Sequence, residues 1–232
     1  MSALTLTAAE IDALRLSLRV SLWAVAASLA PGILAAWLLS RGRFAGKSLL
    51  NGIVHLPLVL PPVVTGYLLL VLMGRRGVIG AWLYDHLGIT LAFDWKGAVL
   101  AAAVMAFPLL VRSLRLSLDQ VDPGLEAAAR TLGAGRLRVF VTVTLPLMVP
   151  GIITGVILAF ARSLGEFGAT ITFVSNIPGQ TQTLPLALFT LTQVPDGETG
   201  AMRLCLLAVV IAIAALVGSE ILARRYASRM RS

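Results

Sequence analysis

Residues 20–40, VSLWAVAASLAPGILAAWLLS, decide the fold of this 232-residue chain. The stretch carries no charged side chain, and it matches the roughly 20 apolar residues that an α-helix needs to cross the hydrocarbon core of a bilayer. Its Pro31-Gly32 pair is compatible with a helix there, because neighbouring helices satisfy the backbone groups that a proline frees. The stretch therefore predicts a membrane-spanning helix.

The rest of the chain repeats this pattern. The protein is 58% hydrophobic and 13% charged, whereas soluble domains are about 45–50% apolar and about 25% charged. We therefore predict an all-α integral membrane protein, a single domain over residues 1–232 built as a bundle of about five transmembrane helices. The further spans are expected over residues 50–73, 96–118, 150–174 and 204–222. Residues 184–193 are apolar but too short to cross, which predicts a re-entrant or interfacial helix.

Basic residues divide unevenly between the connections that five spans create. One set of connections holds twelve Lys and Arg and the other holds six. Because cytoplasmic loops carry the excess of basic residues, the N-terminus is expected outside and the C-terminus in the cytoplasm. The net charge of +8 then reflects these loops, and no nucleic-acid-binding face is expected.

The connection over residues 119–146 is therefore predicted to be cytoplasmic, and it carries helix start and stop signals. Asp122 can cap a helix, Pro123 fits its first position, and Gly133 can end it in the left-handed conformation. A second short helix is expected over residues 137–145, before Pro146. The residues alone leave two hypotheses open, a simple connector or an element on which another protein docks.

This connection is similar to the cytoplasmic loop of binding-protein-dependent ABC importers, whose pattern is E-A-A-x-x-x-G-x9-I-x-L-P. Nine residues separate Gly133 from Val143, as in the pattern, but the family's Glu position is Ala127 and the glutamate stands one residue earlier. The resemblance therefore implies the shape of a coupling-helix loop rather than one particular ion pair. The ATPase-coupling residues that it implies are Glu126, Ala127, Ala128, Ala129, Arg130, Gly133, Leu145 and Pro146.

Three other stretches resemble molybdate permeases: LPLVLPPVV over 56–64, ARSLGEFGAT over 161–170 and SNIPG over 175–179. The resemblance implies a multi-pass permease subunit in the bacterial cytoplasmic (inner) membrane that imports molybdate. It also implies a homodimer, two ATP-binding cassette ATPase subunits and an extracytoplasmic oxyanion-binding protein as partners. Residues 161–179 are shared in part with sulfate permeases, so sulfate and thiosulfate stay open as substrates. Tungstate also stays open, because it nearly matches molybdate in charge, shape and size. A passive anion channel is the alternative class, but a channel does not need a docking loop.

Arg162 and Glu166 are the chemically unusual residues of the fourth predicted span. A charged side chain at the centre of a membrane helix costs about 2.5–3.5 kcal/mol on insertion scales, and a spacing of four places the two on one helix face. Either they form a structural pair that orients helices, or they lie beside the path of the ion. Pro61-Pro62 removes backbone donors from the second span, which predicts a kink. The translocation-path residues predicted are Arg162, Ser163, Gly165, Glu166, Thr170, Pro61 and Pro62.

No catalytic or metal-binding pattern is present in the sequence. There is no G-x4-G-K-[ST] loop that could hold ATP, the only cysteine is Cys205, and the two histidines, His55 and His86, are far apart. We therefore expect a transport subunit rather than an enzyme, with no cofactor, whose energy comes from ATP hydrolysis by a separate partner.

Overall fold

The computed structural model describes the backbone of residues 6–229, and the side chains of residues 6–218 and 221. Every regular element in this part of the chain is helical. The elements are, in chain order, α1 (Ala8–Arg41), α2 (Lys47–Val59), α3 (Pro62–Met73), α4 (Val78–Leu87), α5 (Trp95–Asp119), α6 (Pro123–Thr131), α7 (Arg136–Val139), the π-helical turn Phe140–Thr144, α8 (Leu145–Leu164), α9 (Gly168–Val174), α10 (Leu184–Leu191) and α11 (Glu198–Arg229).

Four uninterrupted helical stretches are long and apolar enough to cross a membrane. They are α1 with 34 residues, α5 with 25, the run Arg136–Leu164 with 29, and the first 21 residues of α11, Glu198–Gly218. A fifth crossing is possible if α2 and α3 form one span, although the two helices are bent by 117° at their junction. The predicted all-α membrane fold with about five apolar helices is therefore confirmed.

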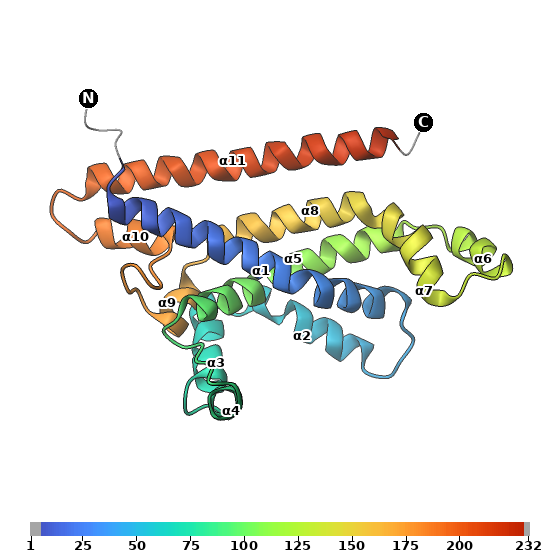
Figure 1. Ribbon diagram of the computed structural model, residues 1–232, viewed down its shortest axis with the longest axis horizontal. Helices are drawn as coiled ribbons and strands as arrows, with labels where there is room; N and C mark the ends of the chain where they lie inside the picture. Colours follow the sequence, from blue (N-terminus) through green and yellow to red (C-terminus); the bar gives the residue numbers. More distant parts are fainter. Residues whose placement is uncertain (1–5, 230–232) are drawn as a thin grey trace.

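The long helices α1, α5, α8 and α11 lie side by side along the longest axis of the molecule (Figure 1). Two contacts fix which ends lie together. Arg203 in the first turns of α11 pairs with Glu10 at the start of α1, and Arg41 at the end of α1 pairs with Glu126 of α6. One end of the bundle therefore carries the starts of α1 and α11, and the opposite end carries α6 and α7.

Helix α5 is the centre of the bundle, because α1 and α8 both pack closely against it. Small residues allow the close approach: a Cβ added to Gly32 of α1 would lie 3.1 Å from the side chain of Leu110. Between α5 and α8, Gly151 of α8 faces Ser117, and the hydroxyl of Ser113 donates a hydrogen bond to the Gly151 carbonyl at 3.0 Å. Alanine, glycine and serine positions thus hold the three helices together.

Two helices expected to be continuous are interrupted. The helix predicted over residues 150–174 is in fact two helices, because α8 ends at Leu164 and α9 begins at Gly168. Glycine on both sides of Glu166 lowers the helix propensity there, and the Glu166 side chain supplies an acceptor for the new helix start. The helix predicted over 50–73 also divides, because Pro61 and Pro62 remove two consecutive backbone donors.

The cytoplasmic connection predicted over residues 119–146 differs in one detail. Its first helix, α6, is capped by Asp122, and Gly133 takes a left-handed φ of 86° just after it. The second helix, however, does not stop before Pro146. It continues through the π-helical turn into α8, since the Leu145 amide bonds five residues back to Phe140. This wider turn accommodates Pro146, which has no amide hydrogen to donate.

Helix α10 is the short apolar segment that was expected over residues 184–193. It has eight residues, and the Leu184 amide at its start donates to the Ser17 hydroxyl of α1 at 2.6 Å. At about 1.5 Å of rise per residue, it is too short to span a bilayer.

Candidate functional site

The two interrupted helices meet each other. A Cβ added to Gly66 of α3 would lie 2.5 Å from the carbonyl oxygen of Ala169 in α9, and one added to Gly168 would lie 2.8 Å from the Pro62 side chain. Such distances mean that the two backbones are in direct contact, which only glycine permits. The junction between α2 and α3 therefore lies against the junction between α8 and α9.

Arg162 and Glu166 occupy the second of these junctions. Nη1 of Arg162, in the last turn of α8, lies 2.6 Å from Oε2 of Glu166. The other carboxylate oxygen, Oε1, accepts the backbone N–H of Ala169 at 2.8 Å, so Glu166 also caps α9. The predicted pairing of the two side chains is present, although a helix break separates them. One buried carboxylate thus serves both the ion pair and the start of a helix.

The pair is asymmetric in its exposure. The Glu166 side chain is 2% exposed, whereas that of Arg162 is 28% exposed. A negative charge is therefore enclosed, whereas the arginine side chain is partly exposed and has donors to spare, because five N–H groups exceed what one carboxylate can accept. The site presents a positive group at its surface.

The depth of the pair follows from its neighbours. The Ser163 hydroxyl donates to the carbonyl of Ala102, in the first half of α5, at 3.5 Å. Ala169 packs in one cluster with Ala102 and with Val20 and Ala24, which lie near the middle of α1. The pair therefore lies well inside the length of the bundle and not at either end.

The predicted path residues fall into two groups. Ser163 and Thr170 are buried among the helices together with Glu166, so their hydroxyls do not line an open surface. Pro61, Pro62 and Gly165 are exposed. Arg162 is the only charged residue of the set that reaches the surface, and it is the strongest candidate for contact with an anion.

Glu126 organises the loop at the other end of α8. Its Oε1 accepts the Thr144 hydroxyl at 2.8 Å and lies 3.7 Å from Nη2 of Arg41, and its Oε2 lies 3.5 Å from Nη2 of Arg130. Arg41 also donates to the Val121 carbonyl at 3.1 Å. Glu126 therefore fastens α6 to the end of α1 and to the π-helical turn, instead of extending outward for a partner.

The loop also presents large apolar side chains outward, beside its exposed arginines. Leu132, just before Gly133, is 89% exposed, and Leu125 and Leu137 are also exposed. These leucines, and also Arg41 and Thr144, are not among the residues predicted from the sequence. The leucines could have been found from the sequence, since large apolar residues are unusual in a loop rich in arginine and small residues. The contacts of Arg41 and Thr144 with Glu126 could not, because they span 85 and 18 positions of the sequence.

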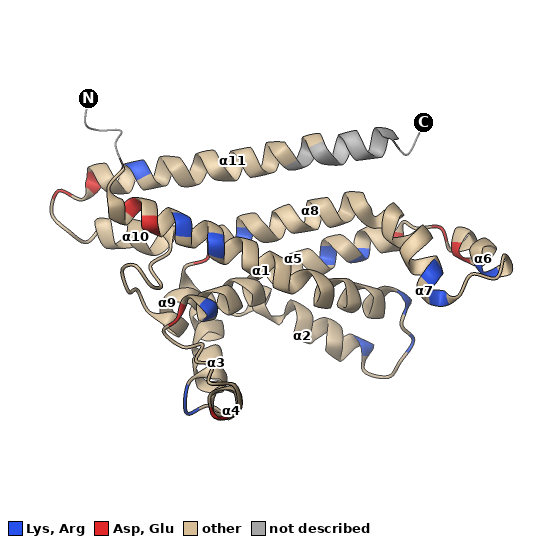
Figure 2. Ribbon diagram, in the orientation of Figure 1, with Lys and Arg blue, Asp and Glu red and all other residues tan. Residues whose placement is uncertain are grey.

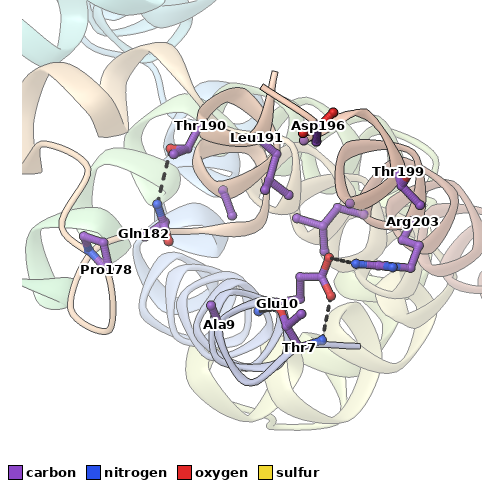
Figure 3. A pocket seen from close by; sticks show the side chains of 14 residues that line it. Thr7, Ala9, Glu10, Pro178, Gln182, Thr190, Leu191, Asp196, Thr199 and Arg203 are labelled. Atoms are coloured by element: carbon purple, nitrogen blue, oxygen red, sulfur yellow. Dashed lines mark hydrogen bonds and ion pairs between the residues drawn. The ribbon is translucent and has the colours of Figure 1, made fainter. Parts of the chain in front are cut away.

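A hollow of about 410 Å³ lies at the opposite end of the bundle, between α1, α10 and α11 (Figure 3). Nη2 of Arg203 donates to Oε1 of Glu10 at 2.8 Å, and Oε2 of Glu10 accepts the Thr7 amide at 2.7 Å. On the other side, Gln182 donates to the Thr190 hydroxyl at 3.3 Å. These polar side chains bond to one another or to the backbone, and the contact between Glu10 and Arg203 holds α1 to α11.

A family model described as binding-protein-dependent transport system inner membrane component matches residues 28–232. The chain is 66% identical over 219 residues to the Molybdenum transport system permease protein ModB of Escherichia coli (strain K12), covering 94% of this chain and 96% of that one. It is 56% identical over 221 residues to the protein of the same name from Haemophilus influenzae, covering 95% and 96%.

A solved structure of a bacterial ABC transporter involved in the import of the acidic polysaccharide alginate has the same fold. The TM-score is 0.74 at 18% identity, with 95% of this chain and 80% of that chain covered.

The asymmetry of the central pair leads to a prediction about stability. Arg162→Gln leaves the enclosed Glu166 carboxylate without its cation, and loss of one partner of a buried pair costs about 3–5 kcal/mol. Glu166→Gln keeps an oxygen for the Ala169 amide and leaves only a partly exposed guanidinium unpaired. We expect Arg162→Gln to lower the free energy of unfolding of the purified protein by more than Glu166→Gln, measured by denaturant titration. Equal losses would contradict the proposed asymmetry.

Proposed function

Because the chain belongs to the family of inner membrane components of binding-protein-dependent transport systems, we propose that it is the permease subunit of an ATP-driven importer that carries molybdate. The assignment of molybdate as the substrate rests on the 66% identity to a molybdenum permease over nearly the whole of both chains. The central site is compatible with this substrate, since a dianion suits a path with one outward-facing guanidinium.

Arg162 is the residue we assign to the ion. A path must attract the anion and also release it, so binding has to be weak. The neighbouring carboxylate of Glu166, 2.6 Å from the guanidinium, offsets part of the positive potential and keeps the site from becoming a deep trap. The exposed Pro61, Pro62 and Gly165 form the unobstructed surface next to it.

The loop of α6 and α7 is the element we assign to ATPase docking. Its exposed leucines and the tight turn at Gly133 offer a compact surface for docking, while Glu126 holds this loop to α1 and to the π-helical turn. Two copies of the chain would enclose the path, one ATPase subunit would dock on each loop, and an extracytoplasmic binding protein would deliver the oxyanion. The chain itself is the transport component and hydrolyses no ATP.

The first experiment measures uptake of radiolabelled molybdate by cells that lack their own molybdate transporter. Expression of the chain with its ATPase and binding protein should restore uptake, and unlabelled tungstate should compete much better than sulfate. Arg162→Gln should lower uptake by about tenfold, equivalent to roughly 1.4 kcal/mol, and Glu166→Gln by less. Strong competition by sulfate would indicate that sulfate, rather than molybdate, is the substrate. Near-normal uptake by the Arg162→Gln/Glu166→Gln double variant would show that the pair has a structural role only.

The second experiment tests docking through the turn at Gly133. Gly133 has a φ of 86° and Gly135 a φ of −67°, and a Cβ at either position meets no atom within 4 Å. Valine at Gly133 is strained, because a left-handed backbone costs a side-chain-bearing residue about 1–2 kcal/mol, whereas valine at Gly135 is not. Gly133→Val should therefore reduce copurification of the ATPase subunit, and Gly135→Val should not. Wild-type copurification by both variants would remove the docking role from this turn.

The third experiment concerns orientation. The excess of basic residues in one set of connections supports a cytoplasmic location for α6, α7 and the C-terminus, and an external N-terminus. In intact cells, a tag at the C-terminus of the protein should then be protected from an external protease, while a tag at the N-terminus should be cleaved. Finding both tags on one side would overturn the model of five crossings.

A further inference from the structure

A second hollow, of about 480 Å³, lies where α1 ends against the coupling loop. Figure 2 shows Lys and Arg gathered at this end of the molecule, on the connection after α1 and on α6 and α7. The size is within the range of small-molecule sites, which is about 300–1,000 Å³. The lining residues are Trp37, Arg41, Arg43, Pro123, Glu126, Arg130, Arg136, Val139, Phe140 and Thr144.

The charge of this hollow is not balanced from within. Four arginines line it against one carboxylate, that of Glu126, which leaves three positive charges in excess. Arg41 and Arg130 are the two that pair with Glu126. The side chains of Arg43 and Arg136 are exposed, and neither makes a hydrogen bond or ion pair with any described residue. Two guanidinium groups therefore remain available for an anion at the same opening.

The rest of the lining is mostly apolar, and part of it comes from the end of a membrane-length helix, α1. Trp37 lies near the end of α1, a helix long enough to cross the bilayer, and it is half-exposed. Tryptophan is enriched at the level of lipid headgroups, where one part of its ring is in contact with lipid and another with water. Phe140 and Val139 add further apolar surface next to the arginines. The hollow thus combines a surface for phosphate with a surface for the glycerol and the first acyl carbons.

We propose that this hollow binds the phosphate of an anionic phospholipid of the cytoplasmic leaflet. Basic pockets beside transmembrane helices on the cytoplasmic side are suited to anionic headgroups, and arginine matches the geometry of phosphate oxygens. The inference rests on the proposed function in one respect, the cytoplasmic location of the coupling loop. A lipid bound here lies between the end of α1 and α6, the two elements that Glu126 joins, and stabilises the loop in its observed position.

The test uses the full-length permease, purified with the subunits that accompany it and examined by native mass spectrometry with added phosphatidylglycerol or phosphatidylcholine. Wild type should bind phosphatidylglycerol about tenfold more tightly than the neutral lipid at the first binding step. Arg43→Gln/Arg136→Gln should lose most of this preference. The matched control, Arg15→Gln/Arg76→Gln, removes two exposed arginines elsewhere in the chain and should keep it.

Three results would overturn the proposal: no preference in wild type, equal preference in the two double variants, or displacement of the lipid by millimolar inorganic phosphate, which would indicate a site for a free anion. Unfolding temperatures in phosphatidylcholine confirm that the variants are folded. Lipid binding is measured without transport, so its failure is separable from failure of the proposed function. Restored molybdate uptake without lipid preference would reject this inference alone, whereas lipid preference without uptake would reject the proposed substrate alone.

Discussion

The structure depends on one constraint: inside a bilayer, backbone polar groups need partners within the protein. Two of the apolar segments are interrupted, one at Pro61-Pro62 and one at residues 165–167. Both interruptions are tolerated because they lie against each other, with Gly66 on Ala169 and Gly168 on Pro62. The Glu166 carboxylate then bonds to one of the amides that the second break exposes. The break in the helix thus provides a backbone amide that stabilises the buried Glu166 carboxylate.

Three carboxylates repeat one design along the length of the bundle. Glu10 pairs with Arg203 at one end, Glu166 with Arg162 in the middle, and Glu126 with Arg41 and Arg130 at the other end. In each case the carboxylate is the more enclosed partner and the guanidinium the more exposed one. Breaking a buried pair is costly, so these contacts fix the positions of the helices. They also leave the surface of each pair positive, which suits an oxyanion at the centre and a phosphate at the end.

The ion pair at the centre and the loop of α6 and α7 are joined by a single helical run. Residues Arg136–Leu164 form 29 consecutive helical positions, with Glu126 bonded to Thr144 near the start and Arg162 near the end. One continuous helical element therefore connects the loop to the ion pair. The π-helical turn Phe140–Thr144 is the exception in this run, and π-helical turns often occur at functional positions.

Much of this protein was determined by its sequence alone. Long uncharged stretches can only be stable as helices in lipid, so the membrane fold and its approximate number of crossings followed from composition and length. Gly133 and Asp122 gave the bend and the start of α6, because caps and left-handed turns depend on a few adjacent residues. The spacing of four between Arg162 and Glu166 likewise placed them within reach of each other.

Only the tertiary structure decided where the long helices break and which charges meet. The break at residues 165–167 has two glycines as its local signal, but it packs against α3, about a hundred residues earlier in the chain. Glu126 bonds to Arg41 and Glu10 to Arg203, and the latter pair is separated by 193 positions. The hollow with four arginines likewise combines α1 with α6 and α7. Such contacts depend on which helices become neighbours, and this is decided by the packing of many small residues at once rather than by any one stretch of sequence.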